Sequence, residues 1–192
     1  MPNPLEQIAS WMEEARSRGE HEPEAMTLAT ANERGEPSAR IVLCRGVGPD
    51  GLRFFTNYTS RKGQELAANP RAAVVFHWKA IERQVRVEGH VSELPAEDSD
   101  AYFAGRTRGS QLGAWASPQS KVIDGLELVR ERQRRAAEEF AGKDVPRPPH
   151  WGGYLLRPSA VELWKAGADR IHERIRYEGS ASQGWRELRL GP

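Results

Sequence analysis

The chain has 192 residues, a length that suits a single domain with its own hydrophobic core. Its 28 Lys and Arg residues against 27 Asp and Glu residues give a net charge of +1, which excludes the strong positive field of a non-specific nucleic-acid binder. The single cysteine, Cys44, excludes an intrachain disulfide and a multi-cysteine metal site, and it suits a reducing compartment. No apolar run approaches the ~18 residues of a membrane span. We therefore expect a cytoplasmic protein without nucleic-acid or membrane partners.

The first predicted element is an amphipathic helix over residues 4–18. Asn3 is a suitable N-cap and Pro4 suits the first turn, while Gly19 is placed to end the helix. The apolar positions recur on one face, at Leu5, Ile8, Trp11, Met12 and Ala15. We expect this face to pack against the rest of the domain.

Residues 26–91 have the pattern of an antiparallel meander. Short β-rich runs such as MTLATA, SARIVLCR and LRFFTNY alternate with turn residues, so at least five strands are expected before residue 92. The run RIVLCR has an arginine at each end, and strand alternation predicts that Arg40 and Arg45 leave by opposite faces. Cys44, within the same strand, is interpreted as a small buried hydrophobic residue.

Residues 60–70 predict a short helix with Ser60 as its cap. Arg61 and Lys62 have the wrong sign for the positive end of the helix dipole, and a bound anion would relieve this. A hydroxyl cap, free backbone N–H groups and two cations favour a phosphate site. An ordinary solvated turn is the alternative, and the sequence alone leaves both open.

Further helices are expected within residues 95–116 and over residues 124–141. The stretch from Tyr102 to Ser120 intersperses small residues with hydrogen-bonding groups, namely Arg106, Arg108, Ser110, Gln111, Gln119 and Ser120. By residue type alone, a generic polar loop would look similar.

The C-terminal part returns to strands, with WGGYLLRP, SAVELWKAG, RIHERIRY and GWRELRL as the expected runs. If residues 170–174 form a strand, Arg170, His172 and Arg174 point to one face. Three cationic groups on one face favour a bound anion, and a solvated cationic ladder is the alternative. The sequence contains no glycine-rich nucleotide-binding motif, no metal-ligand spacing and no nucleophile motif, so no metal is expected.

The motifs follow a specific order over residues 25–192: RIVLCR, FFTNYTSRKGQELAANPRAAVVF, ERQVRVEG, SQLGAWASPQS, WGGY, VELW, RIHERIRY and RLGP. In this order they resemble the pyridoxine/pyridoxamine 5'-phosphate oxidase family. The resemblance implies an α+β fold, mainly antiparallel β, in which an FMN-binding split β-barrel carries flanking helices. It implies one domain over residues 1–192, with an N-terminal helix in residues 1–20 and site-completing strands in residues 152–192. It also implies a homodimer with FMN at the interface.

The resemblance further implies the site residues. FMN would be bound by Arg40, Ile41, Val42, Leu43, Cys44, Arg45, Phe55, Thr56, Arg61, Lys62, Gln84, Gln119, Ser120, Trp164 and Arg174. A phosphorylated B6 vitamer would contact Arg45, Tyr102, Arg106, Ser110, Arg170 and His172. Arg170 and His172 would be the catalytic residues nearest the reacting carbon.

The implied reaction oxidises C4′ of pyridoxine or pyridoxamine 5'-phosphate to pyridoxal 5'-phosphate, with O2 as the acceptor and hydrogen peroxide as a product. The chain departs from the family pattern at Arg45, usually lysine, at Thr107, usually proline, and at Ala166, usually glycine. The residues before Pro4 do not supply the basic arm that typical members carry. These departures bear on substrate identity and turnover more than on flavin binding.

Two alternative functions stay open. One is the related FMN-dependent oxidase of phenazine biosynthesis, which acts on a reduced tricyclic carboxylate and would need a larger, less phosphate-directed pocket. The other is a flavin- or pyridoxal-phosphate-binding protein with little turnover. Substrate-dependent O2 uptake separates an enzyme from a binding protein.

Overall fold

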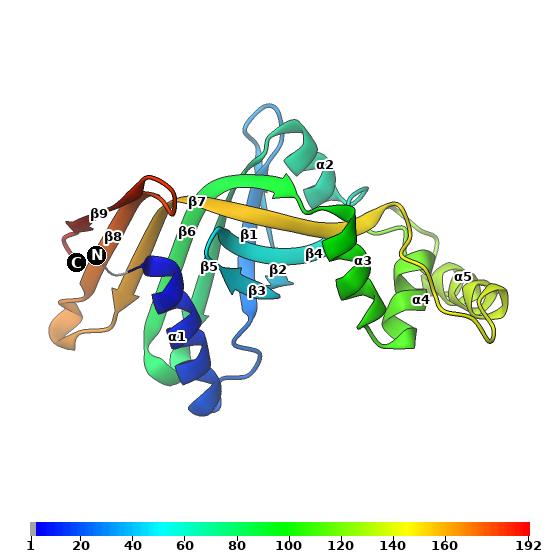
Figure 1. Ribbon diagram of the computed structural model, residues 1–192, viewed down its shortest axis with the longest axis horizontal. Helices are drawn as coiled ribbons and strands as arrows, with labels where there is room; N and C mark the ends of the chain where they lie inside the picture. Colours follow the sequence, from blue (N-terminus) through cyan, green and yellow to red (C-terminus); the bar gives the residue numbers. More distant parts are fainter. Residues whose placement is uncertain (1–2) are drawn as a thin grey trace.

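The computed structural model describes residues 3–192 and shows a curled, antiparallel half-barrel sheet with an N-terminal helix packed on it and further helices at one end (Figure 1). Seven strands follow the order β2-β1-β5-β6-β7-β4-β3, and β8 and β9 continue the sheet beside β7. The strands are β1 Ala25–Ala31, β2 Pro37–Leu43, β3 Gly46–Gly48, β4 Gly51–Asn57, β5 Arg71–Trp78, β6 Arg83–Glu93, β7 Trp151–Lys165, β8 Glu173–Ser180 and β9 Gly184–Arg189.

Strand β7 organises the whole molecule, because it changes partner along its length. Its first part pairs with β4, its second part pairs with β8, and β6 pairs with both parts. The register between β6 and β7 shifts at Gly89, where an added Cβ would lie 2.0 Å from the carbonyl oxygen of Arg157. The sequence predicted two separate strands here, WGGYLLRP and SAVELWKAG, and that prediction is wrong. The shift in register is a β-bulge, which inserts an extra residue without ending the strand. Figure 1 shows β7 crossing from the α3–α5 end of the molecule to the β8–β9 end.

The helices confirm the local sequence signals. They are α1 Pro4–Ser17, α2 Arg61–Ala68, α3 Ala96–Ala104, α4 Arg108–Ala116 and α5 Leu126–Glu139, with short 3-10 turns at Lys79–Ile81 and Ala168–Arg170. The side chain of Asn3 accepts a hydrogen bond from the Leu5 N–H, as expected of an N-cap. No helix within residues 3–192 is long and apolar enough to cross a membrane.

Two groups of buried side chains hold these elements together. The larger group packs the apolar face of α1 on the sheet, and α1 also places Trp11 under the guanidinium of Arg83 at 4.8 Å. The smaller group joins α3, α4 and α5 around Phe103, Phe140 and Trp151. Trp151 begins β7, so the helical end is anchored on the strand that runs through the sheet.

The predicted strand over residues 170–174 is wrong in its first half. Lys165 pairs with Glu173 across β7 and β8, so residues 166–172 form the loop that joins these two strands. Asp169 and Arg170 adopt positive φ angles of 53° and 63°, which a strand does not allow. Arg170, His172 and Arg174 therefore do not share one strand face.

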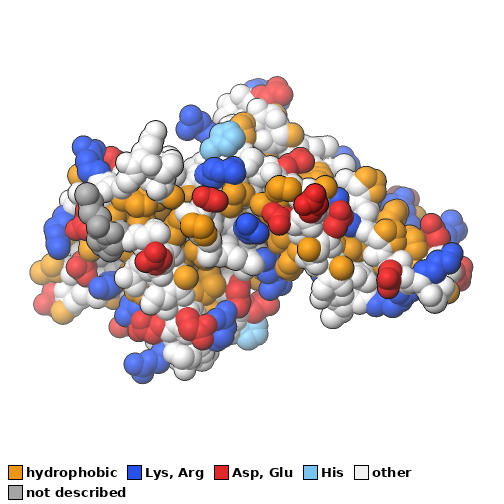
Figure 2. Space-filling model, in the orientation of Figure 1, with side chains coloured by type: hydrophobic (Ala, Val, Ile, Leu, Met, Phe, Trp, Pro, Cys, Tyr) orange, Lys and Arg blue, Asp and Glu red, His pale blue; other side chains and the backbone are white. Residues whose placement is uncertain are grey.

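The charged surface agrees with the balanced composition. Figure 2 shows basic and acidic side chains interspersed over the face in view, without one large basic patch. Cys44 is buried, as expected, and burial raises the pKa of its thiol to about 11. Its thiol is consequently a structural group.

Candidate active site

A cavity of about 730 Å³ lies where β2 and β4 meet the start of α2 and the α3–α4 segment; we call it the active-site cavity. Its lining comprises Arg40, Ile41, Val42, Leu43, Arg45, Phe55, Thr56, Lys62, Ala101, Tyr102, Gly105, Arg106, Thr107, Ser110, Gln119 and Trp151. Arg40 and Arg45 both line it, and so do Ile41, Val42 and Leu43 between them, so the lining takes in both faces of this segment. Strand β2 ends at Leu43 and β3 begins at Gly46, so Arg45 lies between the two strands.

Lys62 is placed in the cavity by the first turn of α2. The Ser60 hydroxyl caps this helix by accepting from the Gly63 N–H, as predicted. Lys62 is only 7% exposed, and its Nζ lies 3.0 Å from Gln119 Oε1 and 3.3 Å from Thr56 Oγ1. Burial lowers the pKa of Lys62 to about 8, and the charge of Arg40 acts in the same direction. All three of its hydrogen-bond partners are neutral, so this cation favours an anionic ligand.

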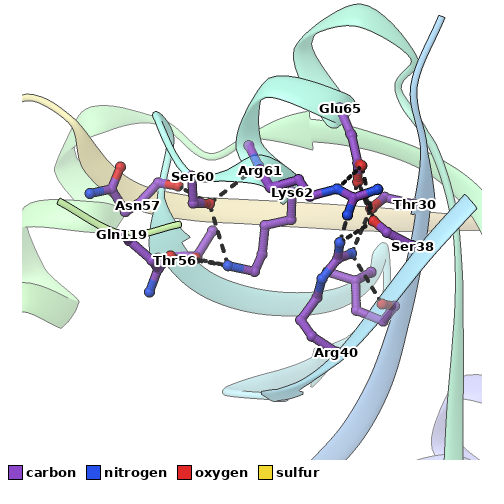
Figure 3. A network of polar contacts seen from close by, with 12 residues as sticks. Thr30, Ser38, Arg40, Thr56, Asn57, Ser60, Arg61, Lys62, Glu65 and Gln119 are labelled. Atoms are coloured by element: carbon purple, nitrogen blue, oxygen red, sulfur yellow. Dashed lines mark hydrogen bonds and ion pairs between the residues drawn. The ribbon is translucent and has the colours of Figure 1, made fainter. Parts of the chain in front are cut away.

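Arg40 is held beside Lys62 by a second set of polar contacts, drawn in Figure 3. Its guanidinium donates to the Leu28 carbonyl at 3.2 Å and to Thr30 Oγ1 at 2.5 Å. It also contacts Ser38 and the carboxylate of Glu65, which is 6% exposed. Burial alone would raise the pKa of Glu65, but hydrogen bonds from four surrounding side chains outweigh it and hold the pKa at about 2.

Aromatic rings form another wall of the cavity. Phe55 on β4 stacks on Tyr102 of α3 with ring centroids 3.8 Å apart, and Trp151 continues the stack 5.7 Å from Phe55. The guanidinium of Arg106 lies over the Trp151 ring at 4.6 Å. Burial lowers the pKa of Arg106, with a further contribution from the charge of Arg45.

The α3–α4 segment brings several predicted substrate residues to the cavity. Tyr102, Arg106 and Ser110 all line it, and the Thr107 side chain caps α4 by accepting from the Ser110 N–H. Two other residues of this segment are structural: Gln111 donates to the Phe103 carbonyl, and Arg108 donates to the carbonyls of Phe140 and Lys143. Sequence reasoning missed Trp151 as a lining residue, although its position directly before Gly152 and Gly153 marks a tightly packed strand end.

A second group of predicted site residues lies elsewhere, and we call it the C-terminal cluster: Gln84, Trp164, Arg170, His172 and Arg174. Gln84 pairs with Trp164 across β6 and β7, and the ring of His172 lies 4.7 Å from that of Trp164. Arg174 binds the Glu162 carboxylate at 2.9 Å rather than joining a cationic face. The C-terminal cluster is absent from the cavity lining. Trp151 and Trp164 stand at opposite parts of β7, about 40 Å apart along the strand at ~3.3 Å per residue.

Three other predicted cofactor residues are also absent from the cavity lining. Arg61 has a side chain that is 62% exposed and pairs with Glu65, Nε to Oε1, at 2.8 Å. Ser120 is an exposed loop residue with a φ of 68°. Cys44 points into the core, where its thiol donates to the Gly46 carbonyl.

Comparison with known proteins shows which family this chain belongs to. A family model described as pyridoxamine 5'-phosphate oxidase matches residues 12–138, and one described as the C-terminal dimerisation region of pyridoxine 5'-phosphate oxidase matches residues 151–192. The chain belongs to the pyridoxamine 5'-phosphate oxidase family. This confirms the resemblance seen in the sequence and makes the chain an oxidoreductase.

Curated members of the pyridoxamine 5'-phosphate oxidase family match over the full chain. A relative from Cupriavidus metallidurans is 50% identical over 191 residues, covering 100% of this chain and 90% of the relative. A relative from Paraburkholderia phymatum is 52% identical and has the same coverage. A relative from Salinibacter ruber is 51% identical and covers 99% of this chain and 89% of the relative. All three bear the name pyridoxine/pyridoxamine 5'-phosphate oxidase.

Solved structures confirm the split-barrel fold of the family. PhzG from Burkholderia lata, solved with tetrahydrophenazine-1-carboxylic acid, matches with a TM-score of 0.93 and 31% identity, covering 99% of this chain and 93% of PhzG. A pyridoxamine 5'-phosphate oxidase-related, FMN-binding protein from Nostoc punctiforme matches with a TM-score of 0.78 and 19% identity over the whole of both chains. The second likeness is one of fold alone.

Proposed function

We propose that this chain is an FMN-dependent oxidase that converts pyridoxine or pyridoxamine 5'-phosphate to pyridoxal 5'-phosphate, with O2 as acceptor and hydrogen peroxide as product. One observation carries the proposal. The active-site cavity has cations at two places, Arg40 with Lys62 and Arg45 with Arg106, and aromatic rings line the space with them. This arrangement suits two phosphorylated ring compounds, a flavin cofactor and a vitamer. The relatives that are about half identical carry the matching name.

FMN fits the residues that are present. Lys62 is a buried cation with only neutral hydrogen-bond partners, and a phosphate would complete its contacts. Arg40 and Lys62 would bind the FMN phosphate, and Thr56, Gln119 and the segment 41–45 would contact the rest of the cofactor. When bound, FMN supplies the electron-accepting group for the oxidation of the substrate. The protein residues bind and orient the two ligands around it.

The substrate phosphate would be bound at the other cationic place. Within residues 3–192, Nη1 of Arg106 is a buried N–H group without a hydrogen-bond partner, and such groups are costly unless a ligand satisfies them. Arg106, Arg45 and the Ser110 hydroxyl offer charge-assisted hydrogen bonds to a phosphate. Tyr102, stacked on Phe55, limits the space for the substrate on that side.

His172 would donate a hydrogen bond to the reacting substituent of the substrate. The Gly167 N–H donates to His172 Nδ1 at 3.3 Å, so a neutral ring carries its proton on Nε2. The Nε2–H group is then a hydrogen-bond donor rather than a base. Arg170, two residues earlier in the same loop, would place a positive charge beside it.

The site would be completed by a second copy of the chain. Arg170 and His172 are far along β7 from the cavity of their own chain, so a partner is needed to bring them to a bound substrate. A homodimer with FMN at its interface satisfies this need. The match of residues 151–192 to a dimerisation region supports it. The single free thiol, Cys44, suits the reducing cytoplasm, where we expect the enzyme to act.

A second candidate is oxidation of a reduced phenazine precursor, which the TM-score of 0.93 to PhzG favours. The lower identity, 31% against about 50% for the vitamer oxidases, makes it the weaker candidate. A flavin-binding protein with little turnover is the third.

An aerobic assay of the purified protein tests the proposal. Pyridoxine 5'-phosphate, pyridoxamine 5'-phosphate and a reduced phenazine carboxylate are supplied in turn, and aldehyde and hydrogen peroxide are followed. We expect turnover of the two vitamers with equal amounts of both products. Turnover of the phenazine alone would assign the second candidate, and FMN binding without any turnover would leave the third.

A further inference from the structure

A buried carboxylate contacts Arg40, one of the two cations that would bind the FMN phosphate (Figure 3). Glu65, on α2, is 6% exposed and accepts hydrogen bonds from residues on three different elements. By charge alone, a carboxylate at this position would repel a phosphate. Its presence therefore calls for a specific role.

The contacts of Glu65 reach both strands beneath α2. Ser38 Oγ on β2 lies 2.7 and 2.9 Å from the two carboxylate oxygens, and Thr30 on β1 donates to Oε2. The same two hydroxyls also accept hydrogen bonds from Arg40. Glu65 thus fixes the acceptors of Arg40 as well as contacting its guanidinium directly at 3.3 Å.

An ordinary helix pair does not account for this arrangement. Arg61 and Glu65 are four residues apart on α2, and an exposed pair of that kind contributes only a few tenths of a kcal/mol to a helix. Such a pair needs one acceptor oxygen at the surface. Here both carboxylate oxygens are buried and accept hydrogen bonds from hydroxyl groups on β1 and β2. These bonds orient the carboxylate so that it contacts Arg40.

The charges also match a phosphate. Of the three cations near Glu65, only Arg40 and Lys62 line the cavity, and Arg61 pairs with Glu65 outside it. The four groups together carry two net positive charges. A phosphomonoester carries close to two negative charges at neutral pH, roughly −1.5 to −2. Lys62 makes no contact with the carboxylate, since its hydrogen bonds go to Thr56, Ser60 and Gln119.

We propose that Glu65 is a positioning residue that determines phosphate recognition: it fixes the Arg40 guanidinium on the cavity wall beside Lys62, and so makes the site prefer FMN to riboflavin. This inference rests on the proposed function, because it takes FMN as the cofactor. Glu65 itself does not touch the phosphate. It acts through Arg40, by removing the freedom of that side chain before the ligand arrives.

Glu65→Gln in the flavin-free full-length chain tests the proposal. The substitution keeps the size of the side chain, removes its charge and replaces one acceptor oxygen with an NH2 donor that opposes the guanidinium. FMN and riboflavin are titrated separately by the quenching of flavin fluorescence. Glu131→Gln on α5, an exposed carboxylate paired with Arg134 and Arg135, is the matched control.

The direction of the change in FMN affinity shows whether Glu65 positions Arg40 or simply repels the phosphate. We expect FMN affinity to fall about tenfold or more, because a charge-assisted contact is lost, while riboflavin affinity stays within about twofold. The control should bind both flavins as the wild type does. FMN affinity that is unchanged or increased overturns the proposal, and so does an equal loss for both flavins, which would indicate a general structural role.

A second variant covers the case in which Glu65→Gln fails to fold. Ser38→Ala keeps the carboxylate but removes a hydroxyl that joins Glu65 to Arg40. It should lower FMN affinity about threefold to tenfold without changing riboflavin affinity, and an unchanged FMN affinity would overturn the proposal. A wild type that binds no FMN would refute the proposed function together with this inference. FMN binding that both variants leave intact would refute this inference alone.

Discussion

The two ends of the proposed site are built in different ways. At the cavity end, Lys62 is buried, Arg40 is half-buried, and both form hydrogen bonds to other elements of the same chain. At the other end, Arg170 and His172 lie in an exposed loop with two consecutive positive φ angles. In the proposed dimer, one chain would form the phosphate-binding end by itself, whereas the end that would touch the reacting carbon would come from a second chain.

The loop carries backbone strain at two consecutive residues. Asp169 and Arg170 are non-glycine residues in the left-handed region, at a cost of order 1 kcal/mol each. Gly167 cannot be larger, because a Cβ would lie 1.9 Å from the Ile171 carbonyl oxygen. Strained backbone of this kind persists where the surrounding structure or a bound ligand stabilises it. Substitutions in the loop should therefore change turnover without changing FMN affinity.

The largest effect is expected from His172→Ala. Loss of the Nε2–H donor should lower turnover about 100-fold or more while FMN affinity is retained, because in the proposed site the FMN phosphate would be bound at the other end. Steady-state kinetics and FMN titration measure the two quantities. His90→Ala, at an exposed histidine on β6, is the control that should behave as the wild type. A loss of FMN binding in His172→Ala would contradict the division of roles.

Lys62→Met should show the opposite pattern. FMN affinity is expected to fall about 10- to 100-fold, since a charge-assisted contact to phosphate is lost, and riboflavin affinity should not change. The flavin-free variant should also unfold at higher denaturant concentration than the wild type, because a buried cation whose hydrogen bonds go only to neutral groups is removed. Lys79→Met, at an exposed lysine, serves as control. Unchanged FMN affinity would show that Lys62 is not a phosphate ligand.

Gly167→Ala tests whether the loop 166–172 orients His172. The added methyl group must displace the backbone that holds His172, so turnover is expected to fall about tenfold with FMN affinity unchanged. Gly48→Ala, where a Cβ meets nothing within 4 Å, is the matched control. Full activity in Gly167→Ala would mean that the hydrogen bond from residue 167 does not orient His172.

The smallest effect is a pH dependence at the cavity end. The pKa of Lys62 is lowered to about 8 in the flavin-free chain, so the cation is fully present below that pH and is lost above it. A phosphate binds the cationic form, so FMN affinity should be constant up to about pH 8 and then fall by at most tenfold per pH unit. Titrations between about pH 7 and pH 9.5 measure this. Lys62→Met should abolish the fall, and a fall that persists in that variant would assign it to another group.

Sequence reasoning succeeded where the signals are local. The caps Asn3 and Ser60 begin α1 and α2 as predicted, and both depend on residues within one helical turn. The first turn of α2 carries two cations, for which the sequence left an anion site and a solvated turn open; Lys62 lies in the cavity and its hydrogen-bond partners are neutral. Tyr102, Arg106 and Ser110, named by the family motifs as substrate residues, line the same cavity, and their contact with a substrate stays a prediction.

The errors concern relations between distant residues. The loop 166–172 was taken for a strand because its boundary is set by the pairing of Lys165 with Glu173, which no local pattern reveals. Glu65 was overlooked because its partners Thr30 and Ser38 are far away in the sequence and meet it only when β1, β2 and α2 assemble. The separation of the C-terminal cluster from the cavity likewise follows from the length and register of β7.

Mixed dimers test the central claim most directly. Arg106→Ala removes the cavity end and His172→Ala removes the loop end, so each variant alone should be nearly inactive. If each site combines the cavity of one chain with the loop of its partner, a heterodimer of the two variants contains one intact site and one doubly damaged site. Random mixing should then restore about a quarter of wild-type activity, because about half of the dimers are mixed. No recovery on mixing would show that each site is built within one chain, contrary to this account.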